Sequence, residues 1–374
     1  MKLTIILSVF IILLSPLVSY GNTPLAPTGL CINDTNCTDI SNLSVTAPKH
    51  ANIHHFNPGY YMLVGQNEGE FEFSHVMNNT DFVGVKKLYR WVDLEVSPGV
   101  YDFSEIENDL KYVQQNGKRL FIQIIEIEMG GWKPWVPKYM WRDESYGCGA
   151  TGKLSFYYGV YERTVQGGGT YPCYWNEKVR NAFYDLYTSL GNRFNNEPYF
   201  EGIALSETSV GYCRDCGYNV GVLKKFYQTV ALRARAAFSN KTVIQMMNYA
   251  PSGFDLVEFA AFCAKNGIGI GGPDVHLNAE RKQSLNEVVY PLYLQYHDEV
   301  ITGIDVQWDN YERYGQTPPI ILQGAIEKVN PYYIFWQKRE PFFSDEVVPL
   351  LRKYGPLPAA KAFYDSVVSQ GNRQ

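Results

Sequence analysis

Acidic residues stand at the ends of several strand-like apolar runs, and they are this chain's candidates for chemistry. Glu207 closes the run at 202–206, and Asp274 follows the tripeptide Gly-Gly-Pro at 271–273. A glycine-rich strand end of this kind allows close approach of a ligand to the chain. Two carboxyl groups in different environments can divide the work of general acid and of base or nucleophile. We therefore predict Glu207 as a catalytic acid and Asp274 as its partner.

Four other acids leave the identity of the second carboxylate open. Two lie on or just after the run 301–309, and two close the run 124–128. Each of them could instead form a structural ion pair with Arg90 or with a lysine. These alternatives are Asp305, Asp309, Glu126 and Glu128.

Polar and aromatic residues near the same strand ends could line a cleft. Arg90 and His276 could hold a hydroxyl group or orient a carboxylate, and Asn248 and Tyr249 end a further run. Aromatic faces stack on ring systems, so tryptophans at strand ends could serve as platforms for a sugar. The predicted substrate-binding residues are Arg90, Trp91, Trp132, Asn248, His276, Gln307, Trp308 and Trp336.

Other common catalytic motifs are missing from the sequence. It contains no Gly-x-Ser-x-Gly elbow, no His-Glu-x-x-His and no Asp-x-Asp-x-Asp-Gly loop. The six histidines are scattered. We predict no cofactor and no catalytic metal.

Eight short apolar runs, alternating with amphipathic helices, must position these residues. Continuous apolar runs are typical of parallel strands that are covered on both faces. Eight repeats of strand and helix favour closure into a (β/α)8 barrel. An open doubly wound sheet is the alternative, but residues 59–69 lack its glycine-rich phosphate loop. The predicted strands are 60–64, 84–91, 119–127, 201–205, 242–248, 267–271, 301–307 and 332–336.

Helix starts are predicted from capping residues. Ser104 and Ser284 each begin a Ser-x-x-Glu capping box, and Asn176 and Ser344 are further N-terminal caps. Thr317 precedes two prolines, which are tolerated in the first turn of a helix.

Three segments resemble one clan of proteins. These are Leu88–Phe103, with its Gly-Val-Tyr-Asp-Phe turn, then Gly202–Thr208 and Tyr332–Trp336. They resemble strands two, four and eight of the (β/α)8-barrel retaining glycoside hydrolases, the clan of cellulase-like and β-galactosidase-like families. The resemblance implies hydrolysis of O-glycosidic bonds with Glu207 as acid/base, and it implies that Trp336 forms the floor of the subsite at the cleaved bond.

Two positions depart from the pattern of that clan. Ser206 stands where the clan has an Asn before the acid, and Gln307 lies near the strand-seven end where the clan has its nucleophilic Glu. The first departure affects a hydrogen bond to the sugar 2-hydroxyl. The second supports an alternative function, a non-catalytic barrel that binds carbohydrate but has lost its nucleophile. A polysaccharide lyase that uses a Tyr or His base is a third hypothesis.

The first residues predict export. Lys2 is followed by an apolar run at 3–14 and by small residues, the pattern of a signal peptide at 1–21. We expect a leader at 22–56 and a barrel at 57–374 with a long insertion at 130–174. The protein would then be secreted or periplasmic, with no stable membrane insertion after removal of the signal.

An oxidising compartment favours disulfides between cysteines that are close in sequence. We predict three pairs and a buried free thiol at Cys263, with a zinc site at Cys213 and Cys216 as the alternative for that pair. The predicted pairs are Cys31–Cys37, Cys148–Cys173 and Cys213–Cys216.

The charge of the chain indicates its class of partner. Its formal net charge is −5, and no run of Lys or Arg is present to neutralise phosphates. We expect a carbohydrate substrate and no nucleic acid, and the oligomeric state stays open.

Overall fold

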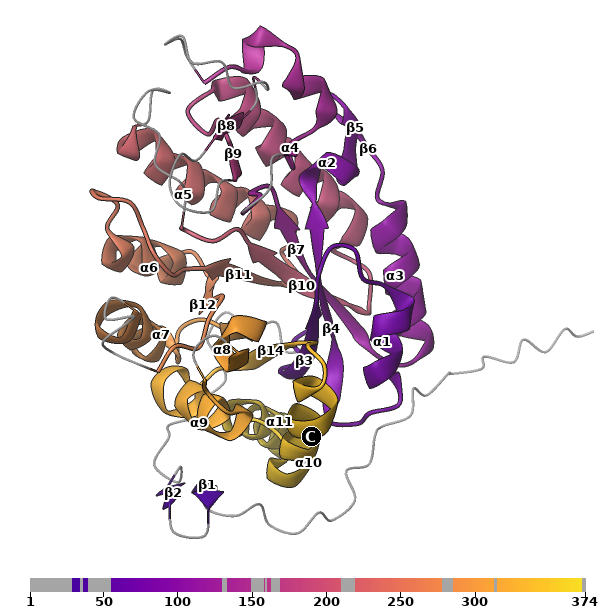
Figure 1. Cartoon of the computed structure of the whole chain (residues 1–374), viewed down its shortest axis with the longest axis vertical. Coiled ribbons are helices and arrows are strands. Elements are labelled where there is room, and N and C mark those ends of the chain that lie inside the picture. Colours follow the sequence, from indigo (N-terminus) through magenta and orange to yellow (C-terminus); the bar gives the residue numbers. More distant parts are fainter. Residues whose placement is uncertain are drawn as a thin grey trace, which may run out of the picture.

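Eight parallel strands form a closed barrel in the computed structural model of the chain (Figure 1). The structure describes residues 29–33, 36–39, 55–129, 133–148, 158, 160–162, 169–209, 219–277, 285–312 and 315–371. Each barrel strand pairs in parallel with its two neighbours, and β14 closes the barrel on β3. The barrel strands are β3 (Gly59–Val64), β4 (Phe82–Arg90), β7 (Arg119–Ile125), β10 (Phe200–Leu205), β11 (Thr242–Met246), β12 (Gly269–Gly272), β13 (Thr302–Val306) and β14 (Tyr333–Gln337).

The predicted (β/α)8 barrel is confirmed, and the open doubly wound sheet is wrong. Every predicted strand is present, with ends within two residues of the prediction. The physical reason is burial on both faces: β3 and β10 are buried along their whole length. Aromatic rings fill the barrel interior, where Tyr61, Phe121 and Phe335 are in mutual contact.

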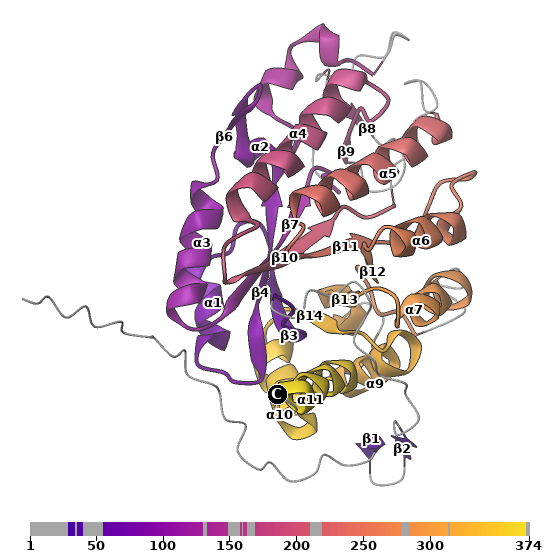
Figure 2. The same ribbon diagram turned by 180° about the vertical axis from the view of Figure 1, so that it is seen from behind.

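Helices surround the barrel, as the opposite views in Figures 1 and 2 show. Their apolar faces pack against the strands in one large core. The helices are α1 (Glu70–Met77), α2 (Trp91–Leu94), α3 (Ser104–Gln115), α4 (Glu177–Phe194), α5 (Val220–Ala237), α6 (Leu256–Lys265), α7 (Tyr290–Tyr296), α8 (Trp308–Glu312), α9 (Pro318–Val329), α10 (Val348–Tyr354) and α11 (Pro358–Gly371).

Shorter elements lie between or before these. Two π-helical turns, η3 (Leu285–Val289) and η4 (Phe343–Val347), lead into α7 and α10, and the 3-10 turns η1 (Lys138–Trp141) and η2 (Glu144–Tyr146) follow β7. Three antiparallel pairs complete the described elements: β1 (Gly29–Asn33) with β2 (Asn36–Asp39), β5 (Glu95–Ser97) with β6 (Val100–Tyr101), and β8 (Val160–Glu162) with β9 (Thr170–Pro172).

The predicted caps have mixed outcomes. Asn176 caps α4, because its Oδ1 accepts the N–H groups of Lys178 and Val179, and Thr317 directly precedes α9. Ser104 is wrong as a cap: it is the first residue of α3, and its N–H is accepted by Asp102.

Ser344 lies one residue inside the predicted helical stretch, because η4 begins at Phe343, and its N–H and Oγ donate to Glu340. The capping box at Ser284 begins outside the described residues.

One of the predicted disulfides is present, between Cys148 and Cys173, whose Cα atoms lie 5.2 Å apart. Cys263 is a free, buried thiol as predicted. The backbones of Cys31 and Cys37 face each other in the β1–β2 ladder, and their bond stays a prediction. Cys213 and Cys216 lie outside the described residues.

Replacing both Cys148 and Cys173 by serine is expected to lower the free energy of unfolding by about 3 kcal/mol, because the bond closes a loop over a sequence separation of 25. Urea unfolding of the variant and of the oxidised wild type measures the difference. An unchanged free energy of unfolding in the double variant would contradict the prediction.

Within the described part of the chain, no helix combines the length and apolar character needed to cross a membrane.

Candidate active site

Glu207 lies directly beyond β10, at the carboxyl end of the barrel strands. Active sites of (β/α)8 enzymes are found at this face. Its Oε2 accepts a hydrogen bond of 2.9 Å from Asn248 Nδ2, just beyond β11, and Tyr227 Oη donates to its backbone carbonyl at 2.8 Å. Thr208 Oγ1 in turn accepts the N–H of Asn248. Glu207 is therefore held from two neighbouring strand ends, and Asn248, predicted to line the cleft, contacts it.

The pKa of Glu207 is raised from 4.5 to about 8. Burial is the largest cause, and the negative charge of Asp274 is the second. The hydrogen bond from Asn248 lowers the pKa, and Lys86 acts in the same direction. A carboxyl group in this state keeps its proton near neutral pH, which a general acid requires.

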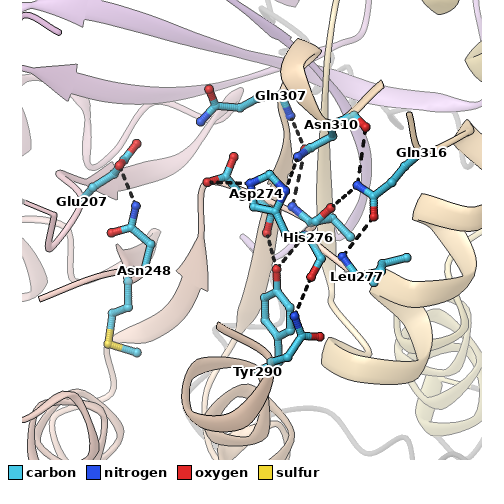
Figure 3. A network of polar contacts seen from close by, with 12 residues as sticks. Glu207, Asn248, Asp274, His276, Leu277, Tyr290, Gln307, Asn310 and Gln316 are labelled. Carbon is cyan, nitrogen blue, oxygen red and sulfur yellow. Dashed lines mark hydrogen bonds and ion pairs between the residues drawn. The ribbon is translucent and has the colours of Figure 1, made fainter. Parts of the chain in front are cut away.

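Asp274 lies beyond β12, and Figure 3 shows its carboxyl group turned to the side on which Glu207 and Asn248 lie. Its side chain is 14% exposed. Tyr290 Oη donates to the Asp274 carbonyl at 3.2 Å and accepts the N–H of His276 at 2.8 Å. Gln316 accepts the N–H of Leu277 and donates to the carbonyl of Val275. Side chains thus hold the backbone where the strand ladder has ended.

Asp305 points into the barrel and is bound to Lys86. Lys86 Nζ lies 2.7 and 2.8 Å from its two carboxylate oxygens, and both side chains are almost fully buried. Burial lowers the pKa of Lys86 and raises that of Asp305, while each charge opposes the shift of the other. This buried ion pair favours a structural role for Asp305, and its alternative role in catalysis stays untested.

Glu126 also has structural partners in the barrel. It accepts hydrogen bonds of 2.6 Å from Ser206 Oγ and from Tyr174 Oη, and burial raises its pKa to about 7. In the clan that the chain resembles, Asn stands at the position of Ser206. Here the Ser206 hydroxyl donates to the buried Glu126 carboxyl group. Glu128 pairs through its backbone with Thr170 in an isolated bridge.

The predicted tryptophan platforms are partly wrong. Trp91 has no exposed surface: its Nε1 donates to Glu95 and its ring packs on Phe183. Trp336 is equally buried and stacks on Tyr311. Neither ring has an accessible face for a sugar.

Three further predicted binding residues lie at the rim of the barrel, and a fourth lies outside the described residues. Trp308 is 41% exposed, with the Arg339 guanidinium 5.7 Å above its ring. Arg90 is bound to Asp93 rather than to a catalytic carboxylate. Gln307 is half-buried beyond β13, and its N–H donates to Asn310. Trp132 lies outside the described residues.

Asp274, His276 and Asp309 bring ligand atoms within 4.8 Å of one another. Two carboxylates and an imidazole at this spacing are a donor set that a divalent metal could use. No metal was predicted from the sequence, where the three residues are not seen as a group because Asp309 follows a different strand. His276 contacts Asp274 and also Asn310, and the second contact bears on whether the imidazole is free to bind an ion.

Other site residues had weak signals in the sequence. Lys86 is a charge inside the apolar run 84–91, and that conflict was an available signal of a buried partner. Asn310, Tyr290 and Gln316 lie in loops and helices with no pattern that distinguishes them.

Comparison with known proteins identifies the fold of the chain but assigns the chain to no family. No family model matches the chain, and no curated protein matches it. Among solved structures, the catalytic domain of a β-amylase from Paenibacillus polymyxa is 9% identical, with a TM-score of 0.52 over 84% of this chain and 99% of that one. Endo-glycoceramidase II from Rhodococcus sp. in a cellobiose-like imidazole complex is 10% identical, with a TM-score of 0.52 over 82% and 81%. The chain shares its (β/α)8 barrel with these glycoside hydrolases.

Proposed function

We propose that this protein is a glycoside hydrolase that cleaves O-glycosidic bonds of a polysaccharide or oligosaccharide. The observation that carries the proposal is Glu207, whose pKa is raised to about 8 beside Asp274 at the carboxyl face of the barrel. Glu207 acts as general acid and protonates the leaving oxygen. Asp274 acts as nucleophile or as the base that activates water.

Elimination among the acids supports this pair. Asp305 is neutralised by Lys86 inside the barrel, and Glu126 is held by Ser206 and Tyr174. Asp274 is partly accessible, and its charge acts on Glu207. A raised pKa on one carboxyl group beside a second, accessible carboxylate is the arrangement that divides acid from base.

The compartment and domain limits belong to the same proposal. A signal peptide at 1–21, a leader at 22–56 and a secreted or periplasmic barrel at 57–374 fit an enzyme that meets polymeric carbohydrate outside the cell. The Cys148–Cys173 bond supports an oxidising compartment.

A second candidate is a barrel that binds carbohydrate without cleaving it. Gln307, at the strand-seven end where the resembling clan has its nucleophile, favours this function. This function requires that Asp274 cannot replace the missing nucleophile. Cleavage that is lost in a variant at Asp274 would therefore favour the hydrolase over the non-catalytic barrel.

Asp274→Asn is expected to reduce glycan cleavage by about a hundredfold or more, because the amide cannot act as nucleophile or base. The assay measures release of reducing ends from a panel of polysaccharides, with Asp298→Asn as an exposed control. Cleavage by the wild type that survives in Asp274→Asn would remove Asp274 from the mechanism. Binding without cleavage by the wild type would favour the non-catalytic barrel, and a product with an unsaturated end would indicate a lyase.

A further inference from the structure

His276 lies between Asp274 and Asn310, and both of its ring nitrogens face a polar group. Its Nε2 is 3.6 Å from Asp274 Oδ2, and its Nδ1 is 3.4 Å from Asn310 Nδ2 (Figure 3). His276 is 2% exposed and Asn310 is fully buried. The imidazole is therefore confined between these two groups, and the Asp309 carboxylate belongs to the same cluster.

The orientation of the Asn310 amide is fixed by the backbone. Its Oδ1 accepts the N–H of Gln307 at 3.0 Å and that of Val275 at 3.5 Å. An amide nitrogen could not accept these two donors, so Nδ2 must be the atom that faces His276. Since Nδ2 can only donate, Nδ1 of the imidazole must accept.

An imidazole that accepts at Nδ1 carries its proton on Nε2 when neutral. That N–H then faces the Asp274 carboxylate. The 3.6 Å separation is longer than a normal hydrogen bond, but such contacts often tighten when substrate binds.

We propose that His276 is a positioning residue for Asp274, and that Asn310 fixes its imidazole in the tautomer with the proton on Nε2, facing the Asp274 carboxylate. The part that concerns catalysis rests on the proposed function, whereas the tautomer itself does not. Residues 274–277 carry both the His276 donor and the Asp274 carboxylate, and the Tyr290 and Gln316 side chains hold the backbone of this short segment. The imidazole therefore keeps Asp274 oriented toward Glu207.

The tautomer is tested directly by nitrogen-15 NMR of histidine-labelled full-length protein near neutral pH. The His276 signals are identified by their loss in His276→Gln. The expected result, at a pH where the ring is neutral, is a proton on Nε2. A proton on Nδ1 of the neutral ring would overturn the proposal.

Asn310→Asp tests the cause of the tautomer. A carboxylate can still accept the two backbone N–H groups but presents only acceptors to Nδ1, so Nδ1 is expected to become protonated while Nε2 still faces the Asp274 carboxylate. Asn116→Asp, at an exposed helix end, is the control and should leave the spectrum unchanged. An unchanged His276 spectrum in folded Asn310→Asp would contradict the assignment.

A kinetic arm tests the link to Asp274 on whichever polysaccharide the wild type cleaves. His276→Leu is expected to lower kcat about tenfold or more with little change in KM. His276→Gln, whose amide nitrogen can replace the Nε2–H donor, should recover much of that loss. Equal kcat values for His276→Leu and the wild type would refute the positioning role. If no polysaccharide is cleaved, the proposed function fails, while the NMR result still decides the tautomer.

Discussion

Glu207→Gln is expected to reduce glycan cleavage by about a hundredfold to ten thousandfold, the usual contribution of a positioned acid. The amide fills the same space and can still accept the hydrogen bond from Asn248, so binding should survive. Wild-type kcat should fall as the pH rises through about 8, because Glu207 loses its proton there. The measurement is release of reducing ends as a function of pH for both proteins.

The control for this variant is Glu299→Gln, an exposed acid before β13 at the opposite end of the barrel. It should match the wild type in rate and in pH profile. Unfolding curves should show that Glu207→Gln is folded. Full activity of that variant at any pH would remove Glu207 from the mechanism, and so would a wild-type rate that continues to rise well above pH 8.

Lys86→Met is expected to lower the free energy of unfolding by about 3–5 kcal/mol, because it leaves Asp305 charged and unpaired inside the barrel. The lysine also lies over the ring of Phe335, 4.6 Å from its centroid, and that contact is lost as well. Urea unfolding of the variant and of the wild type measures the effect.

Two further variants show whether the ion pair is the cause. Lys111→Met removes an exposed lysine on α3 and should have little effect. The double variant Lys86→Met with Asp305→Leu replaces both charges by apolar groups and should regain most of the lost stability. A double variant less stable than Lys86→Met alone would show that the pair is not the origin of the loss.

The barrel could be predicted from sequence because each strand is a continuous apolar run that is buried on both faces. The positions of Glu207 and Asp274 followed from the strand ends alone. The ion pair of Lys86 and Asp305 could not be predicted, since its partners are 219 residues apart and meet only when β4 and β13 face each other across the barrel.

The contacts of two residues at the barrel rim could not be predicted from the sequence. Trp91 directly follows β4, where a sugar platform would lie, but it begins the short helix α2, which brings Glu95 to its indole nitrogen. Asn310 shows no pattern in the sequence, because its role depends on two backbone N–H groups from different loops.

The contact between Ser206 and Glu126 makes these two positions interdependent over the course of evolution. Ser206→Asn would place a larger amide against a buried carboxyl group that already accepts from Tyr174. Glu126 would have to change first or at the same time, so a single substitution at Ser206 would not give this chain the Asn-Glu strand end of the clan that it resembles. The strand-three Glu and the strand-four Ser-Glu therefore form a joint pattern, and either position alone carries less information than the pair.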